Sequence, residues 1–297
     1  MADTSVVLHE QDMKKTSKKQ LIVKIVCLIL VYAFLCTMAL VVLFPFYWMI
    51  SSSLKTIDEY YQDPPTFFPQ TIMWRNYINA FNTANLGRLF GNTLLVGVVS
   101  TILSVVITVL SAFAFARLEF KGKNALFAAL LATMMIPGEL FTITNYVTVS
   151  VFGWLNTYTV LIVPFLVSVF YIYLLRQNFM QIPNELYLAA KVDGTSDLKY
   201  LWKVMIPLAM PTLISITILK MMGAWNSYMW PNLVADNEAY HLITNGLRNA
   251  FTDANSMRTD YPLQMAAITI VSIPLFLVFI FLRKYIMKGV ARSGIKG

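Results

Sequence analysis

Two ionisable side chains interrupt stretches of sequence that are otherwise apolar. Glu139 follows Pro137-Gly138 in one stretch, and Lys220 lies in the middle of another. A charged group at membrane depth is costly, so each marks a candidate position on the path of a polar solute. The alternatives are an acid at the membrane–water interface for Glu139, and an ion pair or a side chain reaching toward the interface for Lys220.

A second candidate set combines amide groups with aromatic rings. Sugars need both, because their C–H faces stack on rings and their hydroxyls need hydrogen-bond partners. The set consists of Asn145, Tyr146, Trp225, Asn226, Tyr228 and Trp230. Trp and Tyr are also enriched at membrane interfaces, and that alternative fits Trp230, just before Pro231, best.

Motifs that would make the chain an enzyme are absent from the sequence. It has no Gly-x-x-x-x-Gly-Lys-[Ser/Thr] loop for ATP phosphates, no nucleophile elbow and no His-Glu-x-x-His pattern. Cys27 and Cys36 stand roughly 13 Å apart on one helix, and with only His9 and His241 as histidines no zinc-type cluster can be assembled. We therefore expect no catalytic residues, no metal site and no cofactor bound by this chain.

The composition shows what kind of elements must position these residues. Of 297 residues, 58% are apolar and 13% are charged, and the mean hydropathy is +0.63. Those values predict an all-α integral membrane protein rather than a soluble or disordered chain. Six apolar runs are long enough to cross a bilayer: Leu21–Ser51, Thr93–Ala116, Ala125–Val149, Thr159–Leu175, Leu208–Trp230 and Leu263–Leu282.

The runs divide the chain simply. Residues 1–20 form an N-terminal tail, and residues 21–297 form one six-span transmembrane domain. The third run contains Pro137-Gly138-Glu139, so we expect its helix to be kinked or broken there. The first run reads as an uncleaved anchor, because about 30 apolar residues follow the basic tail without a signal-peptidase pattern.

The basic residues fix the expected orientation. With six spans, 17 of the 23 Lys and Arg residues fall on the side of the two termini and five on the other side. The positive-inside rule therefore places both termini in the cytoplasm. The net charge of +8 is explained by this topology, and no folded basic domain for nucleic acid is present.

The connection between the fourth and fifth spans has the pattern of two short helices joined at a turn. Gly194 suits the left-handed position that ends the first helix. Thr195 or Ser196 can then cap the second helix, over 197–204. Ala189 and Ala190 give the first helix a face of low relief that a partner can approach closely, although an ordinary connector fits the spacing as well.

This connection resembles the "EAA" loop of ABC-importer permeases, whose pattern is Glu-Ala-Ala, three residues, Gly, then about a dozen residues to Leu-Pro. The matching positions are Ala189, Ala190, Asp193, Gly194 and Pro207. The family's Glu, which contacts the ATPase, is replaced by Leu188, and the nearest acid is Glu185, three residues earlier. The resemblance implies a coupling helix formed by Glu185, Ala189, Ala190, Asp193 and Gly194.

Other strings extend the resemblance over nearly the whole chain. They include 45–56 at the end of the first span, 111–117 at the end of the second, and the tail 289–297. The string Trp225-Asn226-Ser227-Tyr228-Met229-Trp230-Pro231 is similar to one common in the carbohydrate branch of the family.

The resemblance implies a particular assembly in the bacterial plasma (inner) membrane. A second homologous permease would pair with this chain in the bilayer, and two ATPase subunits carrying ATP and Mg would dock at the coupling helix. An extracytoplasmic solute-binding protein would deliver a sugar or oligosaccharide. The short outer connections, 52–92 and 231–262, fit this division of labour.

Other readings remain open from the sequence. A phosphorylated solute such as glycerol 3-phosphate fits the same architecture, but phosphate favours basic partners and only Lys220 is available in the spans. An ion-coupled secondary transporter usually has repeats of broken helices, and none is evident. A channel lacks support, because no filter segment or ring of charges is evident.

Overall fold

The computed structural model describes residues 18–248, 250–252 and 258–294. This part of the chain is helical, and its β pairing consists of one isolated bridge between Thr252 and Thr259. The expected all-α architecture is confirmed.

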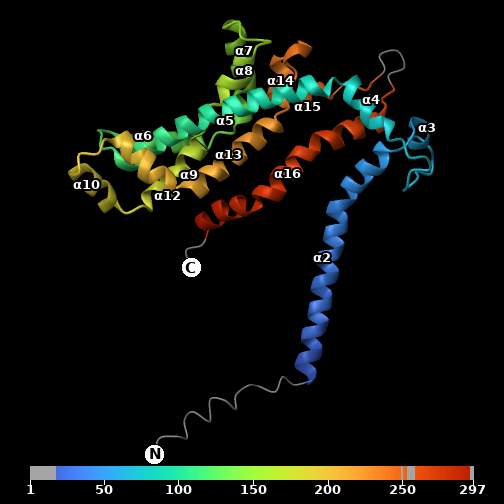
Figure 1. Ribbon diagram of the computed structural model, residues 1–297, viewed down its shortest axis with the longest axis horizontal. Coiled ribbons are helices and arrows are strands. Elements are labelled where there is room, and N and C mark those ends of the chain that lie inside the picture. The colour runs from blue at the N-terminus through green and yellow to red at the C-terminus, as the bar shows by residue number, and fades with distance from the viewer. Residues whose placement is uncertain (1–17, 249, 253–257, 295–297) are drawn as a thin grey trace, which may run out of the picture.

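Three helices are each long and apolar enough to cross a membrane alone. They are α2 (Lys18–Ser53), α5 (Leu86–Arg117) and α16 (Tyr261–Gly294). Helix α5 runs the length of the helical body, from α4 (Arg75–Thr83) to the end where α6 and α10 lie (Figure 1).

Three further candidate spans are bent pairs. In the first pair, α6 (Lys123–Thr133) meets η1 (Gly138–Phe141) and α7 (Thr142–Val151) at 85°. In the second, α8 (Tyr158–Ile162) and η2 (Val163–Phe165) meet α9 (Val169–Met180) at 45°. In the third, α11 (Asp197–Tyr200), η3 (Leu201–Met205) and α12 (Ile206–Leu208) meet α13 (Met210–Trp225) at 83°. The structure therefore has three to six candidate spans by length and composition.

These bends test the expected breaks and boundaries. The break before Gly138 is confirmed, because α6 ends at Thr133 and η1 begins at Gly138. The fifth run was expected to be one helix over Leu208–Trp230, and that expectation is wrong. Helix α13 ends at Trp225, Asn226 forms its C-terminal cap, and α14 (Met229–Val234) is a separate helix.

The packing of α5 shows why this sequence belongs in a bilayer. Its buried face carries small residues at a spacing of four, Ser100, Ser104, Thr108 and Ala112, and Ser104 is only 1% exposed. Its opposite face carries large apolar side chains that are exposed, with Ile102 58% exposed. Small residues let helices pack closely in lipid, whereas an outward apolar face needs a hydrocarbon solvent. Helices α9 and α13 pack against α5.

Helices α5 and α13 approach each other closely at Gly97. A Cβ placed on Gly97 would lie 2.9 Å from Sδ of Met221 and 3.8 Å from Cβ of Ala224. The absence of a side chain at Gly97 therefore lets the two helices pack closely at this level.

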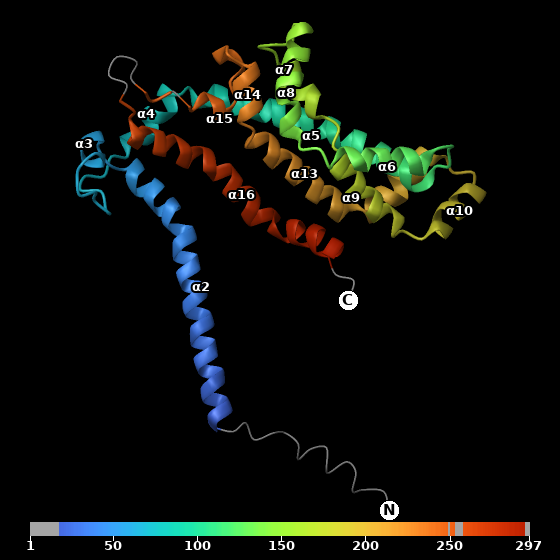
Figure 2. The same cartoon turned by 180° about the vertical axis from the view of Figure 1, so that it is seen from behind.

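Helix α2 diverges from the rest of the molecule. Figures 1 and 2 show it leaving the helical body from its C-terminal end, beside α3 (Ile57–Tyr60). Its most apolar stretch has no buried residue. Near the C-terminal end of α2, the rings of Phe46 and Phe276 of α16 lie 5.6 Å apart.

A compact polar segment anchors that end of α2. The buried Asn76 side chain donates to the backbone oxygens of Ser53 (2.9 Å) and Lys55 (2.8 Å). Lys55 is 1% exposed, and its Nζ lies 4.6 Å from the centroid of the Trp48 ring and donates to the Thr66 oxygen. These bonds hold the direction in which α2 leaves the body.

Candidate functional site

The first candidate site is the loop formed by α10 (Asn184–Val192) and the start of α11. Gly194 has φ +69°, so the expectation that it ends the helix in a left-handed conformation is confirmed. The N–H of Thr195 donates to the oxygen of Ala190 (2.8 Å), and the N–H of Gly194 donates to that of Lys191 (3.1 Å). This pair of bonds is the Schellman arrangement, which satisfies the last carbonyls of the helix.

The expected side-chain cap of the following helix is wrong. Ser196 occupies the N-cap position of α11, but its side chain makes no capping hydrogen bond. Regular helical structure also continues to Leu208 rather than stopping at Val204, through a π-helical stretch over Leu201–Met205.

Three side chains connect α10 to α11 instead. The Lys191 Nζ and Asp197 Oδ1 form an ion pair at 2.7 Å, and the Tyr187 hydroxyl donates to the same oxygen at 2.7 Å. The Tyr187 and Tyr200 rings lie 5.2 Å apart. The hydrogen bond to Asp197 raises the pKa of Lys191. The pKa of Tyr187 is raised mainly by burial and secondly by its own hydrogen bond to Asp197. The two helices are therefore linked through one carboxylate.

The predicted coupling residues lie together on this loop but face two ways. Ala190 is half-buried and packs against the core formed by α5, α9 and α13. The other four, Glu185, Ala189, Asp193 and Gly194, are exposed. Their neighbours Leu188 (55%) and Val192 (88%) are exposed as well, so the outer face of α10 is mainly apolar.

The second candidate site is a cavity of about 390 Å³ between α5, α9, α13 and α14. Lys220 lines it, and its Nζ donates to the Phe165 oxygen at 2.5 Å. The wall includes hydroxyl and aromatic groups: Ser100, Ser168, Tyr171, Ser227 and Trp230. Lys220 is the one charged residue among those that line this cavity.

The other predicted path residues lie elsewhere. Trp225 is buried at the C-terminal end of α13, with its ring centroid 5.8 Å from that of Phe90. Asn226 and Tyr228 are exposed, and the Asn226 amide donates to the oxygen of Met222 at 2.9 Å. The remaining two, Glu139 on η1 and Asn145 on α7, are exposed and do not line the Lys220 cavity.

Trp230, unlike these residues, does line the Lys220 cavity, and this was not expected. The interfacial belt was the favoured place for it, but it is 6% exposed and lines the cavity. Its Nε1 donates to the oxygen of Val160 (2.9 Å), and its ring stands edge-on to Phe165 at 5.5 Å. Trp230 follows Ser227 by three residues, and Ser227 follows Gly223 by four, so helical spacing places all three on the side of the chain that lines the cavity.

Comparison with known proteins adds to this geometry. A sequence profile described as "Binding-protein-dependent transport system inner membrane component" matches residues 86–292. The chain belongs to this family.

Relatives in this family are permease proteins. The chain is 29% identical over 262 residues to the arabinooligosaccharides transport system permease protein AraQ of Halalkalibacterium halodurans, covering 87% of this chain and 93% of that protein. It is 25% identical to the sn-glycerol-3-phosphate transport system permease protein UgpE of Yersinia enterocolitica, covering 86% and 92%.

A solved structure agrees with the fold of this permease. The matching chain comes from a bacterial ABC transporter involved in the import of the acidic polysaccharide alginate. The TM-score is 0.79 at 25% identity, and the match covers 91% of this chain and 98% of that chain. The family resemblance derived from the sequence is thus confirmed.

Proposed function

We propose that this permease is one of two membrane subunits of an ATP-driven, binding-protein-dependent importer of a sugar or oligosaccharide. The observation that carries the proposal is the exposed α10 loop on a member of this family. Oligosaccharide transport by the AraQ relative supports the substrate class.

The proposed topology treats each bent pair as one span. Six spans then place residues 1–20 and the C-terminus in the cytoplasm, in the bacterial plasma membrane. The distribution of Lys and Arg supports this orientation. It puts α10 at the cytoplasmic side, where nucleotide is available.

ATP and Mg are proposed to bind on two separate ATPase subunits that receive α10. The exposed Leu188 and Val192 supply apolar contact, and Glu185 is the acid available in place of the missing family Glu. The second permease would cover the exposed face of α2, and the solute-binding protein would dock on the outer side.

The proposed solute path passes the Lys220 cavity. The exposed residues Glu139, Asn145, Asn226 and Tyr228 would contribute where this chain faces the second permease. Trp225, packed beside Phe90, would act by fixing the position of Asn226.

A phosphorylated solute is the second candidate, because the charged group in the cavity is cationic. Glycerol 3-phosphate transport by the UgpE relative supports it. Competition for uptake by glycerol 3-phosphate but not by arabinooligosaccharides would favour this second candidate.

The proposal is tested by purifying the native complex and reconstituting it in liposomes. We expect a P-loop ATPase and a second permease to co-purify, and uptake to require ATP and the binding protein. Uptake by this chain alone without ATP would contradict the proposal and indicate a self-sufficient carrier.

A further inference from the structure

A second polar cavity, of about 420 Å³, lies where α5 ends, α6 begins and α9 passes. It is at the same end of the helical body as α10 (Figure 1). Its charged lining residues are Glu119, Lys123 and Arg176, and aromatic rings from Phe115 and Phe120 complete the wall.

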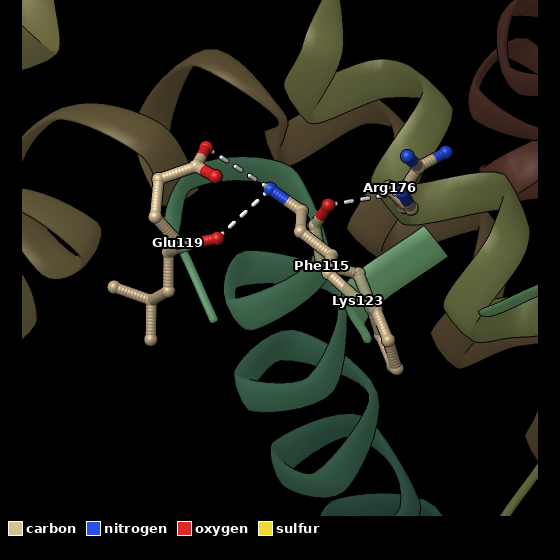
Figure 3. Close-up of polar contacts among 5 residues, drawn as sticks. Phe115, Glu119, Lys123 and Arg176 are labelled. Carbon is tan, nitrogen blue, oxygen red and sulfur yellow. Dashed lines mark hydrogen bonds and ion pairs between the residues drawn. The ribbon is translucent and has the colours of Figure 1, made fainter. Parts of the chain in front are cut away.

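Arg176 is held in place without a carboxylate partner among the described residues. Its Nε donates to the Phe115 oxygen at 3.1 Å, and its guanidinium carbon lies 4.1 Å from the centroid of the Phe127 ring. Figure 3 shows this bond and Lys123 on the neighbouring segment. No described residue accepts a hydrogen bond from the Nη groups of Arg176. The half-buried guanidinium is therefore held in one orientation, and its Nη donors are available to a ligand.

Lys123 places a second cation at the same cavity. Its side chain is only 15% exposed, and Nζ donates to the Leu118 oxygen at 2.8 Å. Glu119 pairs with it at 3.6 Å, but that carboxylate is 92% exposed and so compensates weakly. The cavity therefore carries an excess of positive charge.

The backbone adds further donors. Helix α6 starts after Gly122 without a side-chain cap or an acidic residue in its first turn. The N–H groups of Asn124 and Ala125, which line the cavity, have no acceptor in the described part of the chain. First-turn N–H groups favour anions, and bidentate guanidinium donors favour phosphate oxygens.

We propose that this cavity binds the phosphate group of an anionic phospholipid. The apolar surroundings favour a lipid over a soluble phosphate, since Leu126, Met180 and Phe120 are exposed beside the cavity. Basic pockets between membrane helices bind such headgroups. The proposal is independent of the transported solute.

The test measures lipid binding rather than transport. The delipidated complex is titrated with phosphatidylglycerol or phosphatidylcholine in detergent, and bound lipid is counted by native mass spectrometry. We expect Arg176→Gln and Lys123→Gln each to weaken phosphatidylglycerol binding roughly fivefold, and Glu119→Gln to strengthen it about twofold. Lys121→Gln removes an exposed charge next to the cavity that does not line it, and should have no effect.

The other outcomes are equally definite. Equal loss in Lys121→Gln would mean diffuse surface charge and would overturn the site. Inorganic phosphate that binds with the same dependence on Arg176 and Lys123, without lipid binding, would overturn the lipid assignment. Lys123→Gln is the decisive variant if Arg176→Gln loses its fold, because it is the Arg176 guanidinium that stacks on the buried Phe127 ring.

Discussion

Gly194 is the residue whose backbone the coupling loop depends on most directly. Its φ of +69° costs a residue with a β-branched side chain about 1–2 kcal/mol, although open space surrounds the Cα. We expect Gly194→Val to lower ATP-coupled uptake up to roughly tenfold, and Gly194→Asn to retain most of it, because Asn tolerates this conformation. Uptake per ATP hydrolysed in liposomes measures both. Equal activity of the two variants would show that the backbone conformation does not matter for coupling.

Asp197 accepts from both Lys191 and Tyr187 and so links α10 to α11. We expect Asp197→Asn to speed amide hydrogen exchange in residues 184–196, with Lys199→Gln, an exposed charge change on α11, as the control. Protection unchanged in Asp197→Asn would rule out the link.

The pH dependence of this link follows from the raised pKa of Lys191. Its contribution to stability is complete below the ordinary value of 10.5 and is lost as pH rises through the higher folded value. We therefore expect the exchange difference between wild type and Asp197→Asn to be constant from about pH 6 to about pH 9. A difference that disappears within that range would contradict this origin.

Among the elements, α5 and α13 approach each other closely at Gly97. A side chain at Gly97 meets Met221, so Gly97→Val should destabilise the complex by about 1–3 kcal/mol. Adding Met221→Ala should restore part of that loss, because it opens the space the valine needs.

Thermal unfolding of the purified complex measures both effects. Gly91→Val is the matched control on the same helix, since a Cβ there meets nothing within 4 Å. If Gly91→Val is as harmful as Gly97→Val, the cause is helix propensity rather than the close approach.

The positions of the apolar elements were predictable from the sequence, because hydropathy reports length directly. Pro137-Gly138 also indicated its break, since local backbone chemistry decides it. The bend before Val169 was missed, whereas a helix end before the fifth run was expected between 204 and 208, and the structure places it at Ala209. Pro207 and Pro211 flank the 83° bend at Ala209, and each lacks a backbone N–H, so local backbone chemistry contributes to this bend as well.

The candidate sites, like the helices, could be predicted only in part from the sequence. Gly194 could be assigned from local pattern alone. Lys220 could be chosen because it is charged, but its partner Phe165 and its neighbour Trp230 come from distant segments. Trp225 and Trp230 look alike in sequence, but only Trp230 keeps the spacing of three or four residues that relates the cavity-lining residues Gly223 and Ser227.

At the scale of the whole molecule, the apolar surface of α2 is left exposed. The free cysteines Cys27 and Cys36 lie on this exposed surface. If the second permease covers α2, both thiols should react more slowly with a membrane-permeant maleimide in the assembled complex than in this chain alone. Labelling rates in the same detergent measure this. A cysteine introduced at Ile143, exposed on α7, serves as a reference. Rates for Cys27 and Cys36 that do not change on assembly would mean that lipid, not protein, covers α2.

The bend at Ala209 has a mechanical consequence. The segment Asp197–Leu208 and helix α13 stand at 83°, with lengths of about 18 Å and about 24 Å at 1.5 Å per residue. Two stiff helical segments joined at nearly a right angle rotate together about their joint, as the two arms of a bent lever do. A displacement of the loop end reappears at the far end of α13 in a perpendicular direction, enlarged by about one third. Lys220 lies on that second arm, so a push against α10 would shift the cavity wall sideways rather than along the push.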